Sequence, residues 1–204
     1  SHHMAYLYNF VNKPYKTQAM IRKILEEQYK NSPDGISGNE DCGQMSAWYI
    51  FSSLGFYPVT PGSNEYIIGS PIVKSATINL ENGKTFKINS PNNQKGMPFI
   101  QSVSLNGIEY KKAYLSHFDI VNGGNLTYKM SNTKSDWGTS DEHIPTSKIE
   151  DYFITTPPFI EKGDTAFNEE TKITLKSIQS QATIFYSLGE SFIKYESPIT
   201  ITKD

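Results

Sequence analysis

The chain contains 204 residues, with 19 lysines and arginines against 21 aspartates and glutamates, so its net charge at pH 7 is −2. This length can bury one ordinary core or divide into two or three smaller units, because domains commonly contain about 100–150 residues. The near-neutral charge argues against nucleic-acid binding, and no apolar run approaches the roughly 20 residues that cross a bilayer. The single cysteine, Cys42, is expected to be a small packed residue.

Two helices are expected in the first sixty residues. Apolar side chains recur at helical spacing over residues 17–30 and predict an amphipathic helix. A turn at 31–35 precedes a second helix from about Cys42 to Leu54, which Gly55 ends because glycine readily takes the left-handed conformation. The second helix is apolar on almost every side, so its packing partners are expected in a missing part of the polypeptide.

Short strands are expected after Pro58, where the periodicity changes from helical to alternating. Asn82-Gly83 and Asn106-Gly107 are dipeptides that favour two-residue hairpin turns. Several short strands separated by such turns predict an antiparallel sandwich. The strands are expected at residues 66–68, 76–80, 85–88, 103–105, 108–110 and 126–130.

A polar segment separates this region from the tail. Residues 131–150 contain few aliphatic side chains and predict a linker or surface excursion, with Trp137 as its anchor. From Tyr152 onward a second series of short strands is expected, with its clearest members at 173–175 and 182–187. The tail is therefore expected to be a separate β region.

Adjacent carboxylates stand at the start of the second helix, within the stretch GNEDCGQMSAWYIF. Asp41 and Gln44 have the spacing of a capping box, which is the purely structural explanation of the acidic residues. The preceding turn, however, presents three consecutive oxygen-bearing side chains, Asn39, Glu40 and Asp41, where a cap requires only one. The surplus of oxygen atoms favours a ligand site.

Residues 38–58, GNEDCGQMSAWYIFSSLGFYP, closely resemble the signature of the glycoside hydrolase family 92 α-mannosidases. The upstream block AYLYNF and the downstream stretch SNEYIIGSP resemble further blocks of the same family. The resemblance covers residues 1–138. The tail beyond resembles the small β domains at the C-termini of chitobiase-like glycosidases.

The resemblance implies an α+β multidomain fragment, in which a helical hairpin from an (α/α)6 toroid is followed by antiparallel β-sandwich units. Residues 1–58 would be the last helices of the catalytic toroid, and residues 59–138 the C-terminal sandwich region of the mannosidase. Residues 139–150 would be a linker. Residues 151–204 would be a small Ig-like or chitobiase-type β domain, either complete or truncated.

The resemblance also implies chemistry, since family 92 enzymes are inverting, calcium-dependent exo-α-mannosidases. By this resemblance Asp41 is the general base, while Asn39 and Glu40 line the same pocket as sugar contacts, with Glu40 also a candidate calcium ligand. Glu40 and Asp41 are not expected to form the acid/base pair, because an inverting site separates its carboxylates by about 6.5–9.5 Å. The family's acid glutamate and main calcium element lie upstream of these blocks, so the isolated chain is expected to be inactive.

The two histidines at the start of the chain have two interpretations. His2 and His3 match paired histidines of the family, which implies contacts with mannose hydroxyls; alternatively, residues 1–4 are the remnant of an expression tag. His117 is expected to be a hydrogen-bonding residue at a strand end rather than a metal ligand, because no second histidine follows at metal-binding spacing.

Two functional hypotheses follow. In the first, the chain is the C-terminal part of a secreted, periplasmic or cell-surface bacterial enzyme that removes terminal α-1,2-linked mannose with inversion. Its partners would be mannose-containing glycans and the missing N-terminal part of the same polypeptide, and its export signal would lie outside this chain. In the second, the chain is a non-catalytic carbohydrate-binding or structural β module.

Overall fold

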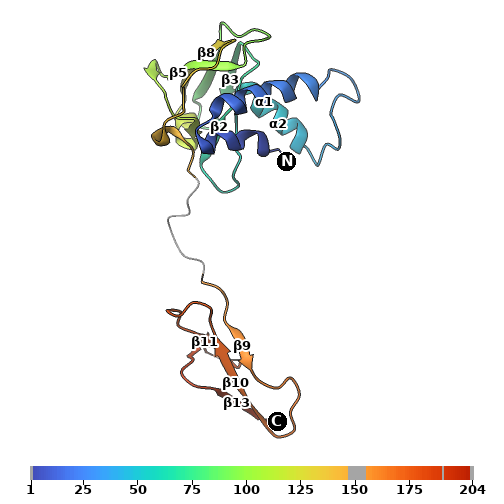
Figure 1. The fold of residues 1–204 in the computed structure, drawn as a ribbon, viewed down its shortest axis with the longest axis vertical. Coiled ribbons are helices and arrows are strands. Elements are labelled where there is room, and N and C mark those ends of the chain that lie inside the picture. The colour runs from blue at the N-terminus through green and yellow to red at the C-terminus, as the bar shows by residue number, and fades with distance from the viewer. Residues whose placement is uncertain (1, 147–154, 190, 203–204) are drawn as a thin grey trace. The chain divides into compact units, whose positions relative to one another are not determined.

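The computed structural model describes residues 2–146, 155–189 and 191–202. The chain forms two compact units, residues 1–147 and 148–204, each with its own sheets (Figure 1). The predicted end of the linker at residue 150 and the start of the tail at Tyr152 fall outside the described residues.

Three helices form one layer of the first unit: the 3-10 helix η1 (Met4–Val11), α1 (Pro14–Glu27) and α2 (Gln44–Leu54). Pro14 opens α1, where its missing N–H has no intrahelical partner to lose. The helix begins and ends three residues earlier than predicted. Gly55 closes α2 with φ 102°, and its N–H is directed at the carbonyls of Phe51 and Ser52, as the sequence predicts.

Two sheets form most of the rest of the first unit. The first is antiparallel, and its strands in spatial order are β1 (Phe56–Tyr57), β2 (Glu65–Ile68) and β7 (Tyr114–Ser116). The second has the spatial order β3 (Ser75–Asn79), β4 (Thr85–Asn89), β8 (Gly124–Ser131), β5 (Phe99–Leu105) and β6 (Ile108–Glu109). The hairpins predicted at Asn82-Gly83 and Asn106-Gly107 are confirmed, since they join β3 to β4 and β5 to β6.

The expectation of a wholly antiparallel arrangement is wrong at one pair of strands. β4 and β8 run parallel, with Ile88 opposite Leu126. Parallel neighbours require a long crossover connection, and here β5, β6, β7 and the short helix α3 (His117–Val121) lie between the two strands in the sequence. Local turn signals do not reveal such a pairing.

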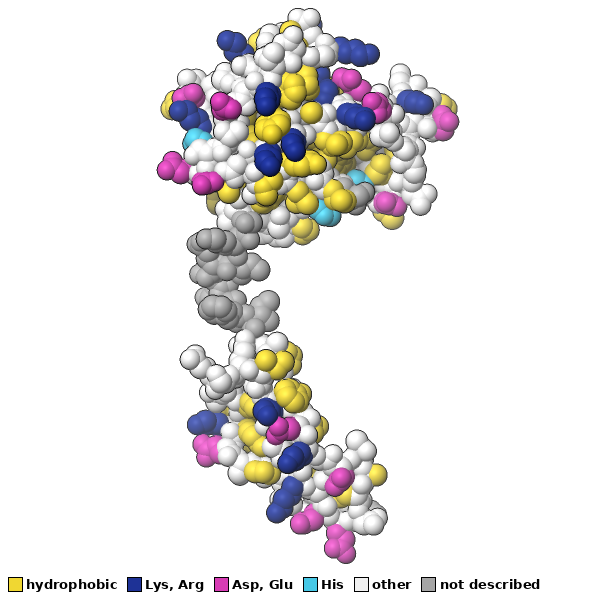
Figure 2. Space-filling model, in the orientation of Figure 1, with side chains coloured by type: hydrophobic (Ala, Val, Ile, Leu, Met, Phe, Trp, Pro, Cys, Tyr) yellow, Lys and Arg dark blue, Asp and Glu magenta, His cyan; other side chains and the backbone are white. Residues whose placement is uncertain are grey.

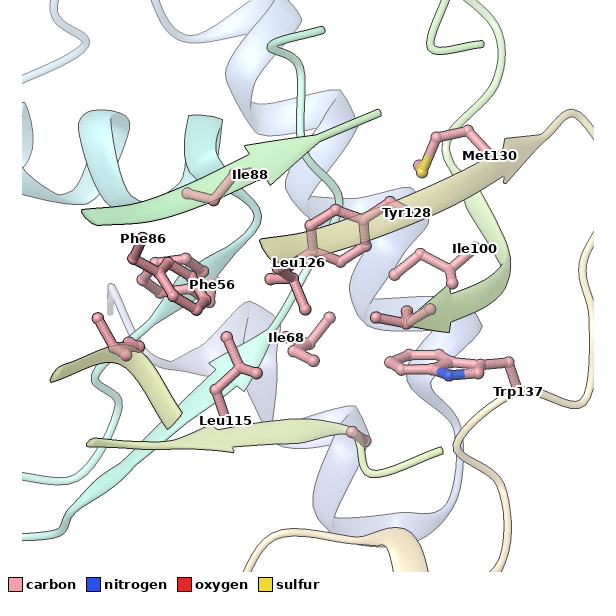
Figure 3. Close-up of a cluster of buried hydrophobic side chains, with 13 residues drawn as sticks. Phe56, Ile68, Phe86, Ile88, Ile100, Leu115, Leu126, Tyr128, Met130 and Trp137 are labelled. Carbon is pink, nitrogen blue, oxygen red and sulfur yellow. The ribbon is translucent and has the colours of Figure 1, made fainter. Parts of the chain in front are cut away.

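The main core lies between the two sheets (Figure 3). Phe56, Ile68 and Leu115 of the three-stranded sheet meet side chains of β4 and β8 in one buried cluster. Strand β4 alternates as a half-buried strand should, with Phe86 and Ile88 fully buried on either side of an exposed Lys87.

A second cluster joins the helical layer to the same three-stranded sheet. The buried ring of Tyr6 stacks on Tyr57 with 5.5 Å between ring centroids, and its hydroxyl lies 2.7 Å from the Ser52 hydroxyl. Asn9 Nδ2 donates to the carbonyl oxygens of Ile68 and Ala113, at 2.8 and 2.9 Å. The three-stranded sheet is therefore covered on both faces.

The polar segment after β8 packs on the first unit as far as it is described. Trp137 is only 9 % exposed, belongs to the main core and donates its indole N–H to the Tyr110 carbonyl at 2.8 Å, which confirms its predicted role as an anchor. Further along, the N–H of Ala113 donates to the His143 carbonyl at 2.7 Å. Residues 139–146 of the anticipated linker thus contact the first unit, while 147–150 lie outside the described residues.

The C-terminal unit contains a three-stranded antiparallel sheet and a separate strand pair. Among its described residues only Thr171 is buried, and Figure 2 shows hydrophobic side chains on its surface. The sheet consists of β13 (Ile199–Thr202), β10 (Glu170–Lys176) and β9 (Phe159–Lys162), and the pair of β11 (Phe185–Tyr186) and β12 (Ile193–Lys194). The predicted strands of the tail are thus present, although the one expected at 182–187 is much shorter.

Arg22 ties α1 to the loops of the sheets. Its side chain is 7 % exposed, and Nη2 donates to the Pro71 carbonyl at 2.5 Å and to Asn93 Oδ1 at 2.8 Å. Longer bonds of 3.5 and 3.4 Å reach the carbonyls of Gln94 and Met97. Burial lowers the pKa of Arg22, yet arginine stays charged at neutral pH.

Replacing this buried cation should destabilise the first unit. Arg22→Met keeps most of the packing volume but leaves carbonyl groups without donors, so we expect the free energy of unfolding to fall by about 3 kcal/mol. Urea unfolding followed by tryptophan fluorescence would measure it, since both tryptophans lie in the first unit. The control is Lys23→Met, whose side chain is 64 % exposed and whose ion pair with Glu27 should contribute under about 0.5 kcal/mol. Equal effects of the two substitutions would contradict the role given to Arg22.

Trp137→Ala should also destabilise the first unit, because it empties a core position and removes the bond to Tyr110. We expect a loss of about 3 kcal/mol, measured by urea unfolding with Trp48 as the remaining fluorophore. Phe118→Ala, at a ring that is 63 % exposed, is the matched control and should change stability little. An unchanged midpoint for Trp137→Ala would mean that the segment after β8 does not belong to the folded unit.

Candidate active site

The turn before α2 has an unusual backbone. Gly38, Asp41, Cys42 and Gly43 all have positive φ, at 95°, 56°, 58° and 92°. For the two residues that are not glycine, the left-handed conformation costs roughly 1–2 kcal/mol each. Strain of this kind persists only where surrounding contacts enforce it, and it occurs preferentially at ligand sites.

The predicted capping box of Asp41 and Gln44 is wrong. Helix α2 begins at Gln44 with Gly43 as N-cap, and Gly43 provides no side-chain cap. Instead Glu40 folds over the first turn, where its Oε1 accepts from the Ser46 N–H and its Oε2 from the Ser46 hydroxyl, both at 3.1 Å. Because the helix begins at Gln44, with residues 41–43 in left-handed conformation before it, the carboxylate that reaches the third helical N–H comes from Glu40.

The same turn presents other polar side chains to solvent. Asn39, Asp41 and Cys42 are exposed, so the expectation that Cys42 is packed is wrong. In the described part of the chain, no hydrogen bond or ion pair engages the Asp41 carboxylate. Of the two adjacent carboxylates, one is therefore bound to the helix and the other is available to a ligand.

The structure places His2 beside this turn. Its ring nitrogen Nε2 lies 2.6 Å from the Met45 sulfur, and its backbone carbonyl accepts from Trp48 Nε1 at 2.8 Å. Met45 is the second residue of α2, and its N–H donates to the Glu40 carbonyl at 3.1 Å. His2 therefore lies against the first turn of α2, whereas the side chain of His3 is exposed.

Tyr29 borders the site, although its sequence position indicates only the apolar face of a helix. Its ring stacks on Trp48 at 5.8 Å and an interplanar angle of 7°, and its hydroxyl donates to the Met45 carbonyl at 3.2 Å. Burial raises the pKa of Tyr29 to about 12, with a further contribution from the negative charge of Glu40. An open hollow of about 530 Å³, lined by Tyr29, Ser46 and Tyr49 among others, lies on this side of α2.

The described residues contain no cluster of carboxylates that would hold calcium by itself. Calcium takes six to eight oxygen ligands, often carboxylates. No cluster of three or more aspartate, glutamate, histidine or cysteine side chains suited to a metal occurs in the part of the chain that is described. Both carboxylate oxygens of Glu40 already accept hydrogen bonds from Ser46. The exposed side chains of Asn39 and Asp41 therefore offer the turn's available oxygen atoms to a metal ion.

Comparison with known proteins shows which family carries this turn. The family model described as the glycosyl hydrolase family 92 catalytic domain matches residues 1–132. The chain belongs to glycoside hydrolase family 92. Its homologues include α-mannosidases, and the resemblance stated from the signature residues is confirmed.

Solved structures of family 92 members share both sequence and fold with the chain. The GH92 α-mannosidase BT3965 from Bacteroides thetaiotaomicron, in complex with mannoimidazole, is 44 % identical with a TM-score of 0.70, over 72 % of this chain and 19 % of that one. The GH92 inverting mannosidase BT2199 from the same organism is 40 % identical with a TM-score of 0.68, over 71 % and 20 % of the two chains.

A curated relative, described as an uncharacterized secreted glycosidase from Arthroderma benhamiae, is 28 % identical over 145 residues, which are 70 % of this chain and 19 % of that protein. The chain thus spans about one-fifth of the length of these relatives.

Within the described residues, no helix has the length and apolar character that crossing a membrane requires.

The raised pKa of Tyr29 gives a test of the site's electrostatics. Since the folded pKa of about 12 exceeds the ordinary value near 10, the neutral phenol is favoured by folding. That stabilisation is complete below about pH 10 and is lost as the pH rises through about 12. Tyrosinate absorbance, compared between wild type and Tyr29→Phe, should show this late titration.

Glu40→Gln should lower the pKa of Tyr29, because a negative charge nearby opposes ionisation of the phenol. Glu27→Gln, at an exposed position on α1, is the control and should leave that titration unchanged. A Tyr29 that titrates near pH 10 in the wild type would contradict the placement of its ring.

Proposed function

We propose that this chain is the C-terminal part of a secreted family 92 exo-α-mannosidase that hydrolyses terminal α-1,2-linked mannose with inversion, and that Asp41 is its general base. Family membership supports the reaction class. Among the relatives, an α-mannosidase in complex with mannoimidazole supports mannose as the substrate, an inverting mannosidase supports the stereochemistry, and an uncharacterized secreted glycosidase supports the location. A bacterial periplasm or cell surface is the compartment we propose.

The observation that carries this proposal is the free Asp41 carboxylate on a strained, exposed turn. A general base in an inverting glycosidase takes a proton from water as that water attacks the anomeric carbon, on the face opposite the leaving group. Such a base must be ionised and accessible to water. Asp41 meets the requirement of access, whereas the neighbouring Glu40 is bonded to Ser46.

The other site residues have supporting roles in the proposal. His2, which lies against the start of α2, and the exposed His3 and Asn39 would contact mannose hydroxyls. The general acid and most ligands of the family's calcium ion would come from the N-terminal part of the polypeptide, so the 204-residue chain alone would be inactive. In this proposal residues 1–58 complete a helical toroid and residues 59–138 form the sandwich region that follows it.

A second candidate function is favoured by one observation in the C-terminal unit. Phe159, Phe185 and Phe192 are 44, 55 and 77 % exposed, and exposed aromatic rings can stack on the apolar faces of sugars. A non-catalytic module that binds carbohydrate, or that only braces the enzyme, would carry such rings. Mannoside affinity that survives Asp41→Asn and is lost in Phe192→Ala would favour this function.

The decisive experiment measures mannose release from α-1,2-linked mannobiose by the 204-residue chain and by the complete polypeptide, each with calcium and with a chelator. Asp41→Asn in the complete polypeptide should lower kcat by about 10²–10⁴-fold, since general-base catalysis contributes that much. Asp34→Asn, an exposed aspartate in the loop before the turn, is the matched control and should leave kcat unchanged. Full activity of Asp41→Asn, or of the isolated chain, would overturn the proposal.

A further inference from the structure

We propose that Glu40 is a positioning residue, which caps α2 through Ser46 and thereby holds the left-handed turn that keeps Asp41 exposed. This inference rests on the proposed role of Asp41 as general base. It assigns to Glu40 a mechanical role in place of direct contact with calcium or sugar.

The geometry is that of an N-terminal cap supplied from four residues before the helix. Ser46 is the third residue of α2, and its N–H is one of the donors that have no partner within the helix. Glu40 satisfies this N–H with one carboxylate oxygen and the Ser46 hydroxyl with the other. A carboxylate at this end of a helix is also favoured by the helix dipole.

The cap is needed because the residues between Glu40 and the helix are strained. The carbonyl of Glu40 accepts from Met45 N–H at 3.1 Å, and that of Asp41 accepts from Gln44 N–H at 3.2 Å. These two backbone bonds, together with the two bonds that Ser46 donates to the Glu40 carboxylate, hold Asp41 and Cys42 at positive φ. Without the carboxylate, the turn can relax toward negative φ, which redirects the Asp41 side chain.

The first turn of α2 is restrained elsewhere, so loss of the cap should act on the turn and not on the helix. Tyr29 donates its hydroxyl to the Met45 carbonyl, and Gln44 Nε2 lies 2.5 Å from the Tyr57 hydroxyl. Both restraints lie on the helical side of the strained residues. Glu40 is therefore the side chain that couples the far side of the turn to the helix.

Two substitutions of Glu40 should differ in effect if its carboxylate is a cap. They should have equal effects if it acts as a charged ligand of calcium. Glutamine at position 40 loses the charge but can still accept from the Ser46 N–H, whereas alanine removes the cap. Amide hydrogen exchange in the 204-residue chain should show the Ser46 N–H exchanging about tenfold faster in Glu40→Ala, and within about threefold of wild type in Glu40→Gln. Ala47 N–H, which donates to the Gly43 carbonyl, is the internal control.

Activity of the complete polypeptide provides the second measurement. Glu40→Ala should lower kcat about tenfold with little change in KM. Glu40→Gln should keep most of the wild-type kcat, with an unchanged calcium requirement. If Glu40→Ala does not fold, Ser46→Ala, which removes one of the two bonds, should give a smaller loss of the same kind.

The outcomes distinguish this inference from the proposed function. Equal losses in Glu40→Gln and Glu40→Ala, with a weakened calcium requirement, would show Glu40 to be a ligand and would overturn the inference. Unchanged exchange of the Ser46 N–H in Glu40→Ala would overturn it as well. If exchange behaves as expected but Asp41→Asn retains full activity, the proposed function fails, and with it the catalytic consequence of the cap.

Discussion

The first unit depends on the burial of strand β2 on both of its faces. Successive residues of a strand point to opposite sides, so Ile67 packs among the helices while Ile68 enters the core between the sheets. Asn9 bonds η1 to the Ile68 carbonyl, and the start of α2 reaches the same layer through Gln44 and Tyr57. The turn that carries the candidate base is therefore attached to a unit of three packed layers, one of helices and two of sheet.

On that unit, the chemistry of the turn follows from its backbone. Left-handed residues direct one carboxylate to solvent while its neighbour returns to the helix as a cap, so Glu40 and Asp41 have different roles despite being adjacent. One free carboxylate is half of what glycoside hydrolysis requires, because an acid must also protonate the leaving oxygen. In the proposed function, the second carboxyl group would come from outside this chain, which spans about one-fifth of the length of its relatives.

The C-terminal unit buries much less apolar surface than the first unit. Its strands pair by backbone hydrogen bonds, yet its described residues bury only Thr171, so little of its apolar surface is removed from water. The first unit, by contrast, buries a continuous core that includes Trp137 beyond the span matched by the family model. The buried apolar core that stabilises the described residues, and the candidate site, thus both lie in the first unit.

The sequence by itself determined what depends on neighbours in the chain. The hairpin turns at Asn82-Gly83 and Asn106-Gly107 and the end of α2 at Gly55 follow from local φ preferences, and the family signature located the turn around Asp41. Tertiary structure decided the parallel pairing of β4 with β8, because distant segments must compete for the same sheet edge. It also decided that Glu40 caps α2, since that depends on the strained path of the backbone, which no spacing of residue types reveals.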